Sequence, residues 1–241
     1  MLKDYLLLHG SLKYALLVLF ILLPLAIVAQ DFENDRPSAR AVPLQERPEI
    51  DGEVMEDPIW QGIAPFGDLI QTQPSFGAPA SEKTEIRIAY TSDTFYLSVV
   101  CYDANPEQLV VSDARRDANL DNTDAFIFIM DTYQDGQNGF IFGTNSLGVE
   151  YDAQVDNEGQ GNFNANRQQG GTIGGFNLNW DAAFEVKAKV GDFGWSAEFA
   201  IPLRTIRFQA GRDWGINFRR NIRKTNEIAY WASLPIGFSL N

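Results

Sequence analysis

Aromatic side chains beside polar loop residues are the first candidates for chemistry in this sequence. Trp180 stands between Asn179 and Asp181 at the end of a long polar stretch, and Trp231 lies near the C-terminus. An indole ring can stack on the apolar face of a pyranose, while amide and carboxylate groups bond its hydroxyls. These residues indicate a sugar-binding surface, and the alternative is that the same rings cap a hydrophobic core at strand ends.

Two adjacent arginines form the second candidate group. Arg115 and Arg116 precede Asp117, and a guanidinium can bind sugar hydroxyls or an acidic sugar through paired hydrogen bonds. The alternative is a loop in which both arginines are ion-paired with neighbouring aspartates. Tyr151, in a strand expected over 149–155, completes the predicted ligand-binding set.

Aspartates at turn positions could supply the hard oxygen ligands that calcium prefers. Their spacing is not that of an EF-hand loop, and aspartates are common in loops for other reasons. We predict a structural calcium site from four of them, namely Asp121, Asp124, Asp131 and Asp135.

The single histidine limits the other kinds of chemistry. His9 falls in the expected signal peptide, so the mature chain would contain no histidine. This excludes Ser-His-Asp and Cys-His nucleophile pairs, and it excludes histidine-ligated zinc and haem. Cys101 lies in an apolar strand and is expected to be a buried small hydrophobe. What remains for catalysis is a pair of carboxylates, which is a spatial arrangement and has no sequence motif here.

The N-terminus has the pattern of an export signal. Lys3 and Lys13 are followed by an apolar run over 15–28 and by the small residue Ala29. We predict that residues 1–29 are a signal peptide cleaved after Ala29, with an uncleaved membrane anchor as the alternative. The formal charge is −13, and removal of Lys3, Lys13 and Asp4 would leave −14, which argues against a nucleic-acid partner.

The elements that must position these residues are predicted to be β-strands. Ile86, Ile88 and Tyr90 alternate with polar residues, and the apolar run 125–130 suits a strand buried on both faces. Short strands separated by turns, with almost no helix, predict an all-β fold, an antiparallel β-sandwich of the immunoglobulin-like or jelly-roll kind. The polar stretch 157–179 is predicted to be a long loop.

The domain plan follows from these patterns. Residues 30–48 are charged and contain prolines, which predicts an exposed linker. Residues 49–235 are predicted to form one sandwich domain, and residues 236–241 a truncated tail. The chain is long enough to bury a core without disulfides.

A series of short motifs runs through residues 45–235 in the order expected of one domain. They are Ile50-Asp51-Gly52, Asp57, Trp60, Gln73-Pro74, Gly77-Ala78-Pro79-Ala80, residues 84–90, Phe95-Tyr96-Leu97, Tyr102-Asp103, Arg115-Arg116-Asp117, residues 121–131, residues 142–152, Trp180-Asp181, Gly194-Trp195, Glu198, Ile201-Pro202-Leu203, Arg207-Phe208 and Trp214-Gly215-Ile216-Asn217. In this series the chain resembles the family 9 carbohydrate-binding modules. It resembles most the version that precedes a bacterial outer-membrane β-barrel domain of unknown function.

The resemblance implies a β-sandwich that holds sugar between aromatic rings, with structural calcium nearby. The sequence departs from it in two ways that matter. Sugar-clamping members have an aromatic just before the strand at 125–130, whereas this chain has Ala118-Asn119-Leu120. The relatives also continue into the barrel, whereas this sequence ends at Asn241.

The combined prediction is a non-catalytic carbohydrate-binding domain of a Gram-negative cell envelope, linked to carbohydrate catabolism. Its expected place is the periplasm, the outer membrane or the cell surface, with an outer-membrane barrel domain as a partner. One alternative is a structural or protein-contact domain of such a barrel protein, favoured if no aromatic replaces the one missing at 118–120. The other alternative is a carboxylate-based glycoside hydrolase or an accessory domain of one.

Overall fold

The computed structural model describes residues 36–156 and 176–232. The predicted signal peptide, the predicted tail and most of the predicted long loop lie outside these residues. Helix in the described part is limited to one short α-helix, α2 (Pro58–Gln61), and two 3-10 turns, η1 (Pro106–Gln108) and η4 (Arg223–Thr225). No helix in these two segments is long and apolar enough to cross a membrane.

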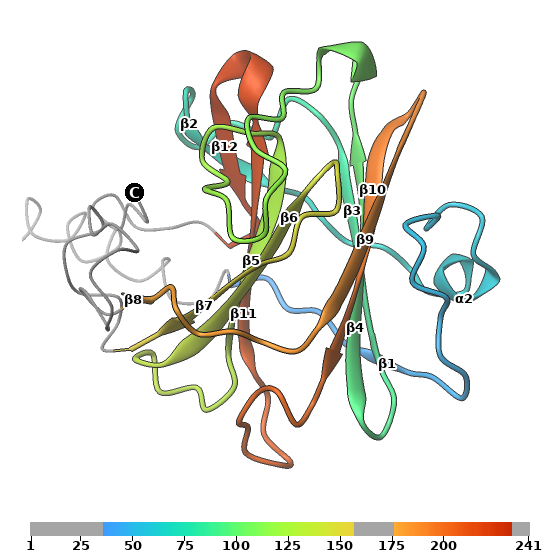
Figure 1. The fold of residues 1–241 in the computed structure, drawn as a ribbon, viewed down its shortest axis with the longest axis vertical. Helices are drawn as coiled ribbons and strands as arrows, with labels where there is room; N and C mark the ends of the chain where they lie inside the picture. The colour runs from blue at the N-terminus through green and yellow to red at the C-terminus, as the bar shows by residue number, and fades with distance from the viewer. Residues whose placement is uncertain (1–35, 157–175, 233–241) are drawn as a thin grey trace, which may run out of the picture. The chain divides into compact units, whose positions relative to one another are not determined.

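The strands form two sheets that face each other (Figure 1). The five-stranded sheet has the order β1 (Val42–Pro43), β3 (Thr84–Tyr90), β4 (Thr94–Tyr102), β10 (Gly194–Pro202), β9 (Glu185–Gly191). The seven-stranded sheet has the order β2 (Ile70–Gln73), β12 (Glu227–Tyr230), β11 (Gly215–Ile222), β5 (Ala125–Asp131), β6 (Gly139–Asn145), β7 (Tyr151–Val155), β8 (Phe176–Asn177). All neighbours pair antiparallel except β1 and β3. The all-β sandwich predicted from the sequence is confirmed.

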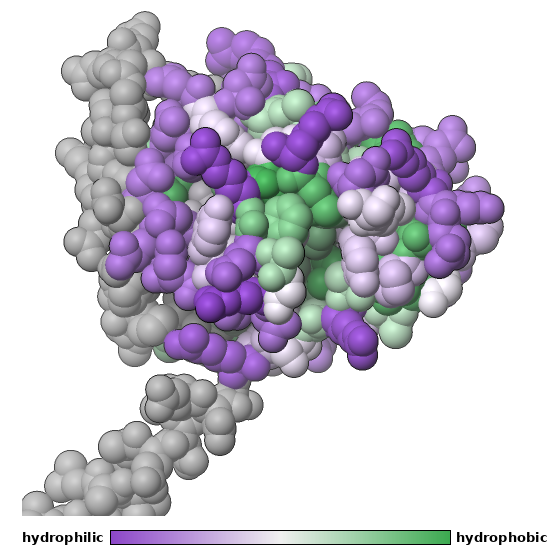
Figure 2. All heavy atoms as spheres, turned by 90° about the horizontal axis from the view of Figure 1, so that it is seen from below, coloured by the Kyte–Doolittle hydropathy of each residue, from purple (hydrophilic) through white to green (hydrophobic). Residues whose placement is uncertain are grey.

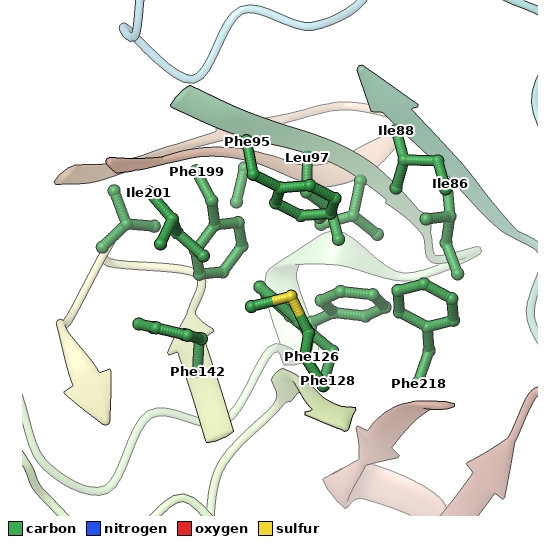
Figure 3. Packing of buried hydrophobic residues seen from close by; sticks show 14 of the residues in the cluster. Ile86, Ile88, Phe95, Leu97, Phe126, Phe128, Phe142, Phe199, Ile201 and Phe218 are labelled. Atoms are coloured by element: carbon green, nitrogen blue, oxygen red, sulfur yellow. The ribbon is translucent and has the colours of Figure 1, made fainter. Parts of the chain in front are cut away.

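The core fills the space between the sheets with large aromatic and branched side chains (Figure 3). Phe128 of β5 meets Phe199 of β10 edge to face, with ring centroids 5.2 Å apart. Phe142 and Phe218 flank Phe128 from the neighbouring strands β6 and β11. Burying each such side chain contributes about 1.5–3 kcal/mol, so this aromatic layer stabilises the contact between the sheets.

Strand β5 differs from its predicted burial. Phe126, Phe128 and Met130 are buried in the core, but Ile127 and Ile129 are only half-buried. Residues alternate between the faces of a strand, and in a two-sheet sandwich one face of each sheet points away from the core. The continuous apolar run therefore marks a strand with one buried face and one partly covered outer face.

The sandwich also starts earlier than predicted. Val42 and Pro43 pair with β3, although residues 30–48 were expected to be a linker. The amide of Leu44 continues this pairing by donating to the carbonyl of Tyr90 at 2.8 Å. Three more residues on, Arg47 forms an ion pair with Asp93.

A second core cluster lies on the outer face of the five-stranded sheet. Val54, Trp60 and Ile63 of the N-terminal segment pack there against Tyr96 and Val100 of β4. Trp60 is fully buried, so this segment acts as a cover for the sheet. The cover explains why strand β4 is buried on both of its faces.

Candidate functional site

The outer face of the seven-stranded sheet carries one row of side chains drawn from four strands. Because Phe128 faces the core, its neighbour Ile127 faces outward. In register with Ile127 lie Gly143 on β6 and Arg219 on β11, and Tyr151 on β7 pairs with Gly143. Directly opposite residues share a face of an antiparallel sheet, so Tyr151 points to the same side as Ile127.

Leu120 fills the middle of this row. A β-carbon at Gly143 would lie only 2.9 Å from Cδ1 of Leu120 and 3.0 Å from Cγ1 of Ile127. Leu120 is 2% exposed, and its carbonyl accepts a hydrogen bond from the side-chain amide of Asn221 at 2.9 Å. The segment that departs from the family pattern, residues 118–120, thus places an aliphatic side chain over the sheet.

Arg116 joins several carboxylates at the start of β7. The amide of Asp117 donates to the carbonyl of Glu150 at 2.8 Å, which fixes this loop beside the strand. The guanidinium then reaches Asp181 at 2.5 Å, Asp152 at 3.1 Å and the carboxylate of Glu150. Asp117 lies 3.8 Å from its Nε. We refer to Arg116, Asp117, Glu150, Asp152 and Asp181 as the Arg116 cluster.

The cluster combines one buried carboxylate with exposed ones. Burial raises the pKa of Asp152 to about 6, while the amide of Ala182 and the guanidinium of Arg116 oppose this shift. The side chain of Asp181 is 82% exposed and that of Arg116 is 42% exposed. The buried carboxylate therefore anchors the arginine, and the exposed groups present charged hydrogen-bonding partners to a ligand.

Trp180 lies beside this cluster and packs on the core. Its ring centroid is 5.1 Å from that of Phe140 and 5.9 Å from that of Phe142. These contacts match the structural interpretation, and the ring is only half-buried, so part of it remains exposed. Asn179 is exposed, and its amide donates to the side chain of Asn177 at 3.2 Å.

Two predicted ligand residues do not join the cluster. The side chain of Arg115 is 86% exposed and is bound to Asp113 through two guanidinium nitrogens, at 3.0 and 2.5 Å. Trp231 is buried, with its ring 5.0 Å from Phe66 and 5.4 Å from Phe218. It follows strand β12, which three strands separate from β7, so Trp231 is a core residue.

The four predicted calcium ligands do not share a site. Asp124 precedes β5 and Asp131 ends it, which places them about 20 Å apart at about 3.3 Å per residue. Asp121 forms an ion pair with Arg219 at 2.9 Å. Asp131 and Asp135 accept backbone N–H groups of their own turn.

These aspartates therefore do not fit the predicted calcium site. Asp124 is buried, and it accepts hydrogen bonds from the amides of Val110 at 2.6 Å and Arg223 at 3.1 Å. Across residues 36–156 and 176–232, no group of three or more His, Cys, Asp or Glu side chains is placed to hold a metal ion. Asp124, Asp131 and Asp135 act instead as caps for turns and strand ends, and Asp121 pairs with Arg219.

A second buried carboxylate was present in the motif series without a predicted role. Glu198 of β10 is fully buried and accepts hydrogen bonds from Trp60 Nε1 at 2.6 Å and from the amides of Gly52 at 2.6 Å and Asp51 at 3.0 Å. Burial raises the pKa of Glu198 to about 7, and these donors oppose the shift. Its donors all belong to the N-terminal cover, so its role is structural.

Known structures with this fold include sugar-binding modules. A family 9 carbohydrate-binding module from Caldicellulosiruptor kristjanssonii in complex with glucose superposes with a TM-score of 0.52 at 15% identity, covering 79% of this chain and 84% of that one. A module of this family from the same organism in complex with cellotriose gives a TM-score of 0.51 at 15% identity, with coverages of 79% and 82%.

A candidate carbohydrate-binding protein from Bacteroides uniformis gives a TM-score of 0.58 at 14% identity, covering 86% of this chain and 94% of that one. No family model matches the chain, and no curated protein matches it in sequence. The similarity therefore establishes that the chain has the β-sandwich fold of the family 9 modules.

Proposed function

We propose that this chain is a non-catalytic carbohydrate-binding domain that holds its ligand at the Arg116 cluster, beside the half-buried ring of Trp180. The fold supports this proposal, because two structures that share it contain glucose and cellotriose. The observation that carries it is the placement of exposed charged groups beside an aromatic ring. Arg116 binds Glu150 and Asp152 at the start of β7, and also Asp181, the neighbour of Trp180. Tyr151 points to the outer face of the sheet, away from Trp180.

The chemistry of the cluster suits sugar hydroxyls. A hydroxyl can donate to the carboxylate of Asp181 or Glu150 and accept from the guanidinium of Arg116. Hydrogen bonds to charged groups contribute about 1.5–3 kcal/mol each, and ring stacking adds apolar contact. A few such contacts, less the cost of association, correspond to binding near the millimolar range, which is about −4 kcal/mol.

The proposal is tested by calorimetric titration of the chain with glucose, cellotriose and a panel of other oligosaccharides. We expect Arg116→Ala to weaken binding at least roughly tenfold, because it removes the group that orders three carboxylates. Arg115→Ala is the matched control, since its guanidinium pairs with Asp113 outside the cluster, and it should bind like the unmodified chain. A folded chain that binds none of the panel would contradict the proposal.

Leu120 gives specific support to a second candidate function, a protein-contact domain. Its side chain occupies the outer face where the sugar-clamping relatives carry an aromatic. If titration shows no sugar binding, this alternative becomes the preferred one. A hydrolase is tested in the same samples, because an enzyme would release reducing ends from the oligosaccharides and a binding module would not.

We further propose that the domain works in the cell envelope of a Gram-negative bacterium, in carbohydrate catabolism and beside an outer-membrane barrel. The support is the export pattern of residues 1–29 and the resemblance in motif order. Fractionation of cells that express the full chain tests this cellular location. Recovery of the uncleaved protein in the cytoplasm would contradict the proposed location.

A further inference from the structure

The segment between β10 and β11, residues 203–214, is basic in an acidic protein. It contains Arg204, Arg207 and Arg212 against a single acid, Asp213, while the whole chain has a formal charge of −13. All three arginines are exposed, and their guanidinium groups make no ion pair or hydrogen bond with the residues that the structure describes. We refer to this segment as the arginine loop.

The same loop presents two aromatic rings. Phe208 is 37% exposed, and its ring centroid lies 5.6 Å from that of Trp214. Trp214 is half-buried and rests on Phe95 of β4, at 5.9 Å, so the pair is supported from below by the core. Figure 2 views the end of the sandwich that carries this loop, and it shows apolar side chains in a hollow framed by hydrophilic ones.

The backbone of the loop is fixed at several points. Ile206 is buried in the core cluster, and the amide of Leu203 donates to the carbonyl of Asp93 at 2.8 Å. The hydroxyl of Thr132 donates to the carbonyl of Arg207, which ties the loop to the turn after β5. A ligand that binds here therefore orders only the ends of long side chains, which keeps the entropic cost of binding low.

We propose that the arginine loop binds acidic glycans, specifically oligosaccharides that carry uronate carboxylates. The apolar face of a pyranose stacks on Phe208 and Trp214, and the guanidinium groups of Arg207 and Arg212 bond the carboxylates. The inference takes its ligand class from the proposed function and adds a second site to it. The negative charge of the rest of the chain repels an anionic glycan, so contact is confined to this loop.

A nucleic acid or an anionic membrane would also meet the three arginines. The aromatic pair favours the glycan, because a ring that packs on the core can stack on the apolar face of a pyranose. A nucleic acid would place a long row of phosphates against a chain of net charge −13, which opposes binding.

The test is titration of the full chain with trigalacturonate and with cellotriose, at low and at high salt. We expect trigalacturonate to bind at low salt and to weaken as salt rises, because its contacts are charged. The double variant Arg207→Ala with Arg212→Ala, and separately Phe208→Ala, should each weaken this binding by roughly tenfold. Lys187→Ala is the control, since it removes one exposed positive charge on β9, outside the loop.

The outcomes separate the two proposals. Unchanged trigalacturonate binding in the double variant, or an equal loss in Lys187→Ala, overturns the acidic-glycan site. Binding to vesicles of anionic lipid in place of trigalacturonate overturns it as well. If Arg116→Ala loses cellotriose binding but keeps trigalacturonate binding, the result supports both sites. If the unmodified chain does not bind cellotriose, the result contradicts only the Arg116 site.

Discussion

Each sheet of the sandwich contains a buried carboxylate with a raised pKa, and the two differ in what surrounds them. Glu198 in the five-stranded sheet accepts hydrogen bonds only from neutral N–H groups, those of Trp60, Gly52 and Asp51. Asp152 in the seven-stranded sheet accepts from the amide of Ala182 and from a guanidinium.

These surroundings distinguish Glu198, a structural carboxylate, from Asp152, which supports the proposed binding surface. The donors to Glu198 belong to the N-terminal cover, so these hydrogen bonds lie inside the protein. Arg116 instead forms ion pairs with the buried Asp152, with Glu150 and with the exposed Asp181. This group of ion pairs therefore reaches the protein surface. A buried carboxylate thus holds a cover in one sheet and orders exposed polar groups in the other.

The largest expected effect is on stability, from Glu198→Ala. The substitution leaves Trp60 Nε1 and two backbone amides without their acceptor, in a buried place. We expect the free energy of unfolding to fall by about 3 kcal/mol, measured by urea denaturation, with sugar binding unchanged. Glu185→Ala on the neighbouring strand β9 is the control, because that side chain is exposed. Equal stability of the two variants would show that the cover does not depend on Glu198.

The next largest expected effect is a dependence of folding stability on pH, which follows from the carboxylates of Glu198 and Asp152. The pKa of Glu198 is raised from 4.5 to about 7 and that of Asp152 from 3.8 to about 6, chiefly by burial. The folded state then binds these protons more tightly than the unfolded state, so this contribution to stability is complete below pH 4 and is lost as pH rises through 7. We expect a loss on the order of 2 kcal/mol between pH 6 and pH 8, flattened in Glu198→Gln. Stability that rises over this range in the unmodified chain would contradict the shifts.

Asp181→Ala is expected to act on binding and not on folding. Its side chain is 82% exposed, so its removal should leave the unfolding midpoint unchanged. Binding of cellotriose should weaken roughly fivefold, because one charged acceptor of the Arg116 cluster is lost. Asp135→Ala, in an exposed turn after β5, is the comparison for a loss of charge elsewhere. An equal effect of the two substitutions on affinity would mean that Asp181 does not touch the sugar.

The smallest expected effect is a gain of affinity from Asn119→Trp. Asn119 is exposed and lies in the segment where the resemblance to sugar-clamping family 9 modules leads us to expect an aromatic. The new ring offers one more stacking surface, and we expect cellotriose to bind roughly threefold more tightly. The substitution also removes the acceptor for the amide of Asp121, so thermal unfolding is measured in parallel. Unchanged affinity in a folded variant would place the sugar away from residues 118–120.

The sequence predicted the sandwich because alternation is a local signal. Ile86 and Ile88 of β3 recur at every second position, and so do Ala197 and Phe199 of β10, and all four are buried as their spacing indicates. The continuous run of β5 was less informative, since an outer face with isoleucines has the same composition as a second buried face.

The site was only partly predictable, because its contacts join distant segments. Arg116 meets Asp181 across 65 residues and Glu198 meets Trp60 across 138 residues, and no spacing rule connects such pairs. The four aspartates were assigned to one metal site from their turn positions and from the resemblance, whereas β5 separates Asp124 from Asp131. Trp180 packs on the core, as its structural interpretation predicted, and its half-buried side chain leaves the sugar-binding interpretation as a prediction.

The most direct test of the sugar-binding account is mapping of the contact surface by nuclear magnetic resonance. Cellotriose is added to the isotopically labelled chain, and shifts of the backbone amide signals are followed residue by residue. The account predicts the largest shifts at residues 150–152 and 179–182, and their loss in Arg116→Ala. Shifts confined to the N-terminal cover around Glu198, or no shifts at saturating cellotriose, would contradict it.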